Sequence, residues 1–329
     1  MKRVALLTVF VAVLIGFLVA VQASLAVAWE PKEAIEFIAP ANPGGGWDTI
    51  CRTSARVLQK TALIKQPAYV ANMPGGSGSV AIAYVVKKRR GDNNLLVAAS
   101  NALTFSMAIK RTPYTYDDIT PLAQVASEFG GYVVRADSKF KTLADLVKAL
   151  KADPKSVTFA GGSAPGGMDH IKVALLAKEI GVDPLKISYV PYQGGGEALA
   201  SLLGGHVEVG SLDLSEVAGQ LEAGKVRVLA VLSENRLKAF PDLATAREQG
   251  VDVVFNIWRG LYMAPGVSKE AKEFWVATIK KMVATPEWNS ERQKLGWEPV
   301  VKFGDDFASF VKDEYQRYKT LLKELGFVK

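Results

Sequence analysis

Short apolar runs alternate with longer amphipathic stretches along most of the chain. The longer stretches have the spacing of amphipathic helices, as residues 143–150 and 198–203 illustrate. This alternation predicts parallel βαβ units in a doubly wound sheet, and therefore an α/β fold. The predicted strands, rich in β-branched and aliphatic residues, are 35–39, 69–72, 95–99, 132–135, 156–160, 187–190, 207–210 and 226–232.

The C-terminal segment has a different pattern, because helical spacing continues there almost without interruption. Helices are predicted over 270–283, 287–295 and 305–325, with Ser268 and Thr285 as their start signals. We expect these helices to cover a sheet face or to clamp two lobes together.

A glycine-rich pattern occurs twice, at residues 45–50 and 166–171, each time after a predicted strand and before a helical stretch. Two further glycine clusters, 74–78 and 193–196, follow at similar distances. The duplication and the chain length predict two lobes. We expect one lobe from 29–127 plus 252–329 and the other from 128–251, with crossings near 124–132 and 252–258.

Two such lobes facing each other would direct helix N-termini into a shared cleft. These ends carry unpaired N–H groups and partial positive charge, so the cleft would suit an anion. The alternative is that the glycines only permit tight turns. Backbone N–H groups would hold a carboxylate, and polar side chains would orient it. The candidates are Asn42, Gly45, Gly46, Trp47, Asp48, Gly75, Ser100 and Asn101 in the first lobe, and Gly162, Ser163, Gly166, Gly167, His170, Gln193 and Gly194 in the second.

Several of these candidates have a structural alternative. Asp48 and Asp169 stand where a first-turn carboxylate caps a helix, which is at least as well supported as ligand contact. Trp47 either lines the site or packs in the core. For His170 the site is favoured over the core. Arg259 pairs either with a ligand carboxylate or with an acidic residue between the lobes, and the structural role is slightly favoured.

The first residues have the pattern of a secretory signal. Lys2 and Arg3 precede an apolar run over 4–21, and the small residues 26–28 match an A-x-A cleavage pattern. We expect cleavage after Ala28 and a periplasmic mature protein that begins at Trp29. A cleavage pattern at 21–23 competes, and an uncleaved anchor is the alternative.

Charge and cysteine content exclude several classes of function. The formal net charge is +7, and the basic residues are spread out except for the run 87–90, where cations suit a helix end. We therefore expect no nucleic-acid partner, whereas an anionic ligand is compatible with the charge. The one cysteine, Cys51, cannot form an internal disulfide and is expected to be a buried, inert thiol.

Signatures of catalysis are missing from the sequence. It contains no G-x-S-x-G, H-E-x-x-H, C-x-x-C or Walker A motif, and its glycine loops lack the ordered dinucleotide-binding fingerprint. Its two histidines, His170 and His206, lie 36 residues apart, which gives little support for a metal site. We therefore expect a binding protein with no cofactor, no metal and no enzymatic activity.

The motifs as a set resemble the solute receptors of tripartite tricarboxylate transporters, the TctC type within the Bordetella uptake group of periplasmic binding proteins. The resemblance covers nearly the whole predicted mature chain in order. It is carried by residues 40–48, 72–78, 161–163, 169–171, 192–197, 214–216 and 256–260.

This resemblance implies a two-lobed, flytrap-like receptor that captures an organic carboxylate, di- or tricarboxylates being favoured. It also implies delivery to a membrane permease of one large and one small subunit, with the receptor acting as a monomer. Receptors of this kind can alternatively present their closed form to a sensor kinase. Asp213 stands where the tricarboxylate-type pattern has glycine, so it joins the candidates as a residue that would disfavour a trivalent anion or select a ligand with a hydroxyl or ammonium group.

Overall fold

The computed structural model describes residues 29–328. The predicted signal segment, 1–28, and its cleavage after Ala28 lie outside the described residues. Contacts divide the chain into Met1–Glu30 and Pro31–Lys329, and the fold presented below is that of the second unit. Across the described part of the chain, every helix is too short or too polar to cross a membrane.

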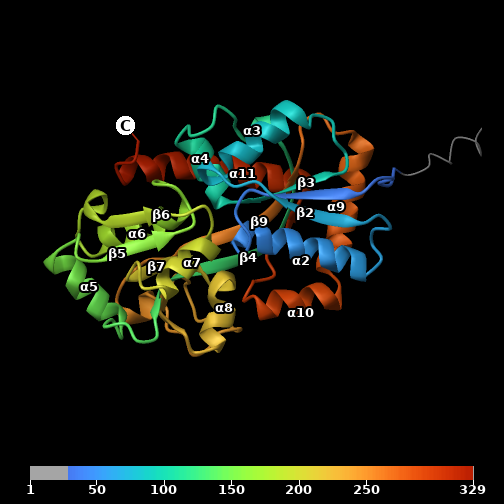
Figure 1. Cartoon of the computed structure of the whole chain (residues 1–329). Helices are drawn as coiled ribbons and strands as arrows, with labels where there is room; N and C mark the ends of the chain where they lie inside the picture. The colour runs from blue at the N-terminus through green and yellow to red at the C-terminus, as the bar shows by residue number, and fades with distance from the viewer. Residues whose placement is uncertain (1–28, 329) are drawn as a thin grey trace, which may run out of the picture. The chain divides into compact units, whose positions relative to one another are not determined.

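Three parallel strands form the first part of the sheet. β1 (Ile35–Ala39) pairs with β2 (Ala68–Asn72) on one side and with β3 (Leu95–Ser100) on the other. The connections run through α2 (Gly46–Lys60) and α3 (Ser79–Lys88), as expected for βαβ units. Figure 1 shows these two helices on opposite sides of the strands, which explains why all of β3 is buried.

A second set of parallel strands repeats this arrangement. β5 (Thr158–Gly161) lies between β6 (Ser188–Pro191) and β7 (Val209–Asp213). α6 (Met168–Glu179) and α7 (Gly195–Leu203) follow β5 and β6. The duplicated unit of strand, glycine loop and helix is therefore present in the fold.

Antiparallel strands connect the two parallel sets. β4 (Thr120–Arg135) pairs along its first part with β9 (Asn256–Met263) and along its end with β7 and β8 (Val226–Val231). β9 also pairs with β3, and the short β10 (Lys302–Phe303) pairs with β4. The ten strands within residues 29–328 thus form a mixed sheet with the order β2-β1-β3-β9-β4-β7-β5-β6, to which β8 and β10 add through β4.

The predicted C-terminal helices are confirmed to within one residue at most ends. The Ser268 hydroxyl accepts a hydrogen bond from the Ala271 N–H at the start of α9, and Thr285 does the same for Trp288 at the start of α10. The remaining helices are α4 (Asn101–Ala108), α5 (Leu143–Ala152), α8 (Leu214–Glu222), α9 (Lys269–Val283), α10 (Pro286–Lys294) and α11 (Gly304–Glu324), with 3₁₀ turns at Gly76–Gly78, Tyr116–Asp118, Pro184–Lys186 and Arg247–Gln249.

Burial of aliphatic and aromatic side chains holds the sheet and helices together. Trp258 of β9 packs edge-on against Phe307 of α11, with 5.5 Å between the ring centroids, which fixes the last helix on the sheet. Cys51 is free and fully buried in α2, and burial raises the pKa of its thiol. The prediction that this thiol is buried is confirmed.

Candidate functional site

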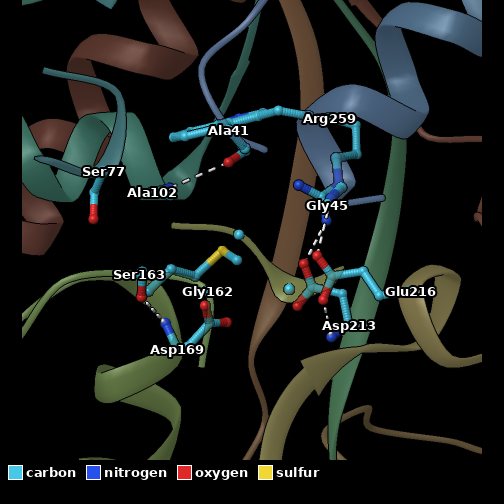
Figure 2. A pocket seen from close by; sticks show the side chains of 16 residues that line it. Ala41, Gly45, Ser77, Ala102, Gly162, Ser163, Asp169, Asp213, Glu216 and Arg259 are labelled. Carbon is cyan, nitrogen blue, oxygen red and sulfur yellow. Dashed lines mark hydrogen bonds and ion pairs between the residues drawn. The ribbon is translucent and has the colours of Figure 1, made fainter. Parts of the chain in front are cut away.

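A small cavity lies where the carboxyl ends of several strands meet the N-termini of the helices that follow them. Its volume is about 30 Å³. In open α/β sheets this is the place where ligands bind. Figure 2 shows the cavity, which is lined by Ala41, Gly45, Gly46, Trp47, Ser77, Ser100, Ala102, Gly162, Ser163, Met168, Asp169, Gly194, Gly195, Asp213, Glu216 and Arg259.

Two glycines of the cavity wall, Gly46 and Gly162, are required because neighbouring atoms leave no room for a side chain. Neither is required by an unusual backbone conformation. A Cβ atom at Gly46 would lie 2.2 Å from Arg259 Nη2, and one at Gly162 would lie 2.3 Å from the Gly195 nitrogen. Neither glycine has a positive φ angle. The interpretation of these loops as simple turns therefore does not account for either residue, since a turn that needs glycine needs the left-handed region.

Ionised side chains meet on one side of the cavity. The Arg259 guanidinium is paired with Glu128 and with Asp213. Lys172 Nζ lies 2.7 Å from Asp213 Oδ1 and 2.8 Å from Asp169 Oδ1. Lys172 is fully buried and Arg259 is 2 % exposed, so these ion pairs are shielded from water. Figure 2 shows the Arg259 guanidinium directed toward the acidic residues.

The protonation states in this cluster follow from its pairing. Burial alone would raise the pKa of Asp213, but the charges of Lys172 and Arg259 outweigh it and hold that pKa below its usual value. Burial alone would lower the pKa of Arg259, but attraction by Glu128 and Asp213 raises it. Asp213 therefore lines the cavity as an ionised group with two cationic partners. Because its charge is compensated, Asp213 gives no reason to expect that a trivalent anion binds poorly.

Glu216 also faces the cavity, and its carboxyl group crosses to another helix. Oε1 accepts the Gly46 N–H at 2.9 Å, and Oε2 accepts the Asp213 N–H at 3.1 Å. Burial and the nearby negative charges of Asp213 and Asp169 raise the pKa of Glu216 to about 8. Within the part of the chain that the structure describes, these acidic residues form no group suited to a metal ion.

Serine hydroxyl groups line the side of the cavity away from this cluster. Ser77 Oγ accepts the Ala164 N–H at 2.8 Å, and Ser100 Oγ accepts the Ala102 N–H at 3.3 Å. Ser163 Oγ accepts the Asp169 N–H at 2.9 Å. A hydroxyl that accepts one bond can still donate its own hydrogen, so the serines can serve as donors to an anion.

The structure brings eight of the sixteen predicted ligand-binding residues to the cavity wall. Ser163 and Asp213 come from the loop after β5 and the end of β7, and Ser100 ends β3. The eight that line it are Gly45, Gly46, Trp47, Ser100, Gly162, Ser163, Gly194 and Asp213; the eight that do not are Asn42, Asp48, Gly75, Asn101, Gly166, Gly167, His170 and Gln193.

Two of the latter have structural partners that account for them. Asp48 accepts hydrogen bonds from the Gly44 N–H at 3.0 Å and from the side chains of Arg52 and Asn72, each at 2.9 Å, so it has a local structural role beside the start of α2 and does not cap that helix. The Asn101 amide donates to the Asn256 carbonyl at 2.9 Å and accepts the Trp258 N–H at 2.8 Å.

His170 is likewise engaged within the protein. Its Nδ1 accepts the Gly166 N–H at 3.0 Å, and its ring stacks on Tyr189 with 4.4 Å between centroids. Burial lowers the pKa of His170 to about 4, so the ring is neutral at physiological pH.

Asn42 and Gln193 join two loops beside the cavity. The Asn42 N–H donates to the Gln193 carbonyl at 3.1 Å, and the Asn42 amide donates to Glu197 Oε1 at 2.5 Å. The loop after β1 is thereby fastened to the loop after β6.

Sequence reasoning did not place every lining residue in the site. Glu216 carries one local signal, since Asp213 and Glu216 have the spacing of a capping box, but that signal predicts a helix start and not a cavity. For Arg259 the sequence left two roles open, pairing with a ligand carboxylate or with an acidic residue of the protein. The lining residues absent from the predicted set are Ala41, Ser77, Ala102, Met168, Asp169, Gly195, Glu216 and Arg259; for Asp169 the sequence favoured a helix cap.

Comparison with known proteins identifies the family. Residues 50–327 match the model of the tripartite tricarboxylate transporter family receptor, TctC. The chain belongs to this family. The predicted resemblance is therefore confirmed, and with it the classes of periplasmic substrate-binding protein and non-enzymatic transport receptor.

Individual relatives of this TctC-family receptor agree with the assignment. Protein BugT of Bordetella pertussis is 28 % identical over 300 residues, covering 90 % of this chain and 90 % of its own. The structure of MatC from Rhodopseudomonas palustris with bound malate has 22 % identity and a TM-score of 0.79, covering 89 % of this chain and 99 % of its own. An R. palustris protein solved with adipate, Rpa4515, has 23 % identity and a TM-score of 0.83, covering 90 % and 98 %. The two structures establish the fold, a mixed α/β periplasmic-binding-protein fold.

Proposed function

We propose that this receptor captures a small dicarboxylate in the cavity and delivers it to a tripartite membrane permease of one large and one small subunit. The mature protein would begin at Trp29 and act as a monomer. Its two lobes would be 29–127 plus 252–329 and 128–251. The observation that carries the proposal is the convergence of α2, α6, α7 and α8 at the cavity, each contributing residues from its N-terminal end. Unpaired N–H groups at helix N-termini are suited to a carboxylate.

The residues that line the cavity favour an organic acid over other small molecules as the ligand. Hydroxyl groups of Ser77, Ser100 and Ser163 can donate to carboxylate oxygens, and Arg259 adds a fixed positive charge. Trp47, Ala41 and Ala102 supply apolar surface for a short carbon chain. Related structures with bound malate and adipate support short dicarboxylates as the class.

Binding of such a ligand requires the site to open. A volume of about 30 Å³ corresponds to one water molecule, which is less than any dicarboxylate occupies. The loops after β1 and β6 contact each other through Asn42 and Gln193, so these contacts would break on opening and reform on closing. The ligand would then shift the population toward the closed form by bridging the two lobes.

A thermal-melt screen of the protein from Trp29 onward tests the proposal. The panel contains malate, adipate, citrate, aromatic acids and acidic amino acids. A ligand at 100 times its Kd stabilises by about 2.7 kcal/mol. At roughly 2 °C per kcal/mol this is a rise of about 5 °C. A rise with malate or adipate supports the proposal, whereas a rise with none of the acids, repeated after unfolding, dialysis and refolding to remove any retained ligand, contradicts it.

A further inference from the structure

The Glu216 carboxyl group lies where helix N-termini from separate parts of the fold meet. Glu216 is in the first turn of α8, and its Oε2 accepts the N–H of the α8 cap residue, Asp213, at 3.1 Å. Its other oxygen, Oε1, accepts the N–H of Gly46, the first residue of α2, at 2.9 Å. α2 follows β1 in the first set of parallel strands, and α8 follows β7 in the second. A single side chain therefore joins the two sets.

The N-terminus of α2 has no cap from its own sequence. Its cap residue is Gly45, which has no side chain to accept an N–H. Gly195, the first residue of α7, lies against the same carboxyl group, because a Cβ at Gly195 would fall 2.1 Å from the Glu216 Cδ and from both oxygens. Glu216 thus supplies the acceptor that α2 lacks, in a pocket that the glycines leave open.

We propose that Glu216 occupies, in the ligand-free receptor, the position at the N-terminus of α2 that a ligand carboxylate takes, so that a ligand must displace Glu216 in order to bind. This inference rests on the proposed function. It assigns Glu216 two roles, which are to hold the ligand-free protein closed and to lower its affinity for carboxylates through competition.

The geometry around Glu216 allows only one carboxyl group at this position. Glu216 Oε1 accepts the Gly46 N–H at 2.9 Å, so a ligand carboxylate can accept this N–H only after Glu216 leaves. Arg259 is held by Glu128 and Asp213 whether or not Glu216 is present, so the cationic side of the site remains when Glu216 leaves.

Removing the competitor should tighten binding. Isothermal titration with malate and with adipate is compared for the wild type, Glu216→Ala and Glu216→Gln. Glu216→Ala removes the acceptor with which a ligand carboxylate competes for the Gly46 N–H, so loss of this hydrogen bond should lower the Kd roughly three- to tenfold. Glu216→Gln keeps an acceptor for the Gly46 N–H and should give a smaller gain in the same direction, and it serves if the alanine variant fails to fold.

Glu197→Gln is the matched control. Glu197 also links the loop after β1 to α7, through Asn42, but it does not line the cavity. This variant should leave the Kd unchanged, because glutamine keeps an acceptor for the Asn42 amide and Glu216 still occupies the position at α2. An unchanged or raised Kd in both Glu216 variants, with the wild type binding normally, would overturn the inference and leave the proposed function intact.

Small-angle scattering of the ligand-free proteins provides a readout that does not need a ligand. The wild type and Glu197→Gln should be more compact than Glu216→Ala. Equal radii of gyration for the wild type and Glu216→Ala would contradict the closing role. If the wild type binds no acid at all, the proposed function fails, and the competition with it, whereas the scattering comparison still decides the closing role of Glu216.

Discussion

Replacement of Gly46 by alanine should destabilise the protein, although alanine is the better helix former. Gly46 begins α2 and has no positive φ angle, so the backbone itself accepts alanine. The new Cβ would lie 2.2 Å from Arg259 Nη2, 2.6 Å from Cζ and 2.7 Å from Nη1. Arg259 cannot simply move aside, because Glu128 and Asp213 hold it in a buried pair of salt bridges.

The size of the effect follows from two opposing contributions. Breaking a buried ion pair by removal of one partner costs about 3–5 kcal/mol, and a displaced guanidinium loses part of that. Alanine in place of glycine in a helix returns roughly 0.5–1 kcal/mol. We expect a net loss of about 2 kcal/mol in the free energy of unfolding. At roughly 2 °C per kcal/mol this lowers the Tm by about 4 °C.

Gly45→Ala is the matched control for this prediction. Gly45 has φ −80° and ψ 164°, which alanine adopts freely, and its nearest neighbours would lie 3.5 Å from a new Cβ. Urea unfolding followed by circular dichroism gives the free energy of unfolding for both variants and the wild type. Gly45→Ala should fall within about 0.5 kcal/mol of the wild type. Equal stability of the two variants would refute the reasoning, since both changes add the same atom to the same loop.

Two further predictions concern the charged groups at the cavity. Burial and the charges of Asp213 and Asp169 raise the folded-state pKa of Glu216 to about 8, well above that of a glutamate in the unfolded chain, so the folded protein holds a proton that the unfolded chain releases. The stability of the ligand-free protein should therefore fall as pH rises through that interval, and Glu216→Gln should flatten the decline in urea midpoints measured from pH 5 to pH 9; an unchanged slope would contradict the assignment. Lys172→Met keeps the length of the side chain but leaves Asp169 without a cation and Asp213 with Arg259 alone. It should lower the free energy of unfolding by about 3–5 kcal/mol in the same assay, and a loss below about 1 kcal/mol would show that these carboxylates are not held by Lys172.

Local signals in the sequence were sufficient for most elements of the fold. The starts of α9 and α10 depend on hydroxyl groups that bond three residues ahead, so Ser268 and Thr285 mark them without tertiary information. β9 is one exception, because no strand was predicted over Asn256–Met263, and another is β4, of which only the end was predicted. Polar residues such as Gln124 and Glu128 interrupt the apolar pattern over its first part, and they are buried through partners that the local sequence does not reveal.

The position of the cavity was predictable for a similar reason. Glycine loops at the carboxyl ends of predicted parallel strands place helix N-termini at one edge of a sheet, and the cavity lies at that edge. Which polar side chains face it was not predictable from type alone. His170 and Asn101 have the chemistry of ligand contacts, yet internal hydrogen bonds hold both away from the cavity.

By itself the sequence determined the family, the α/β alternation and the glycine loops, because each of these depends on patterns of residues that are close together along the chain. The tertiary structure decided the electrostatics of the site. Asp213 is neutralised by Lys172 and Arg259, which are 41 and 46 residues away, and Glu216 reaches across 170 residues to Gly46. Coulombic interactions and burial depend on distance in space, and folding alone brings such residues together.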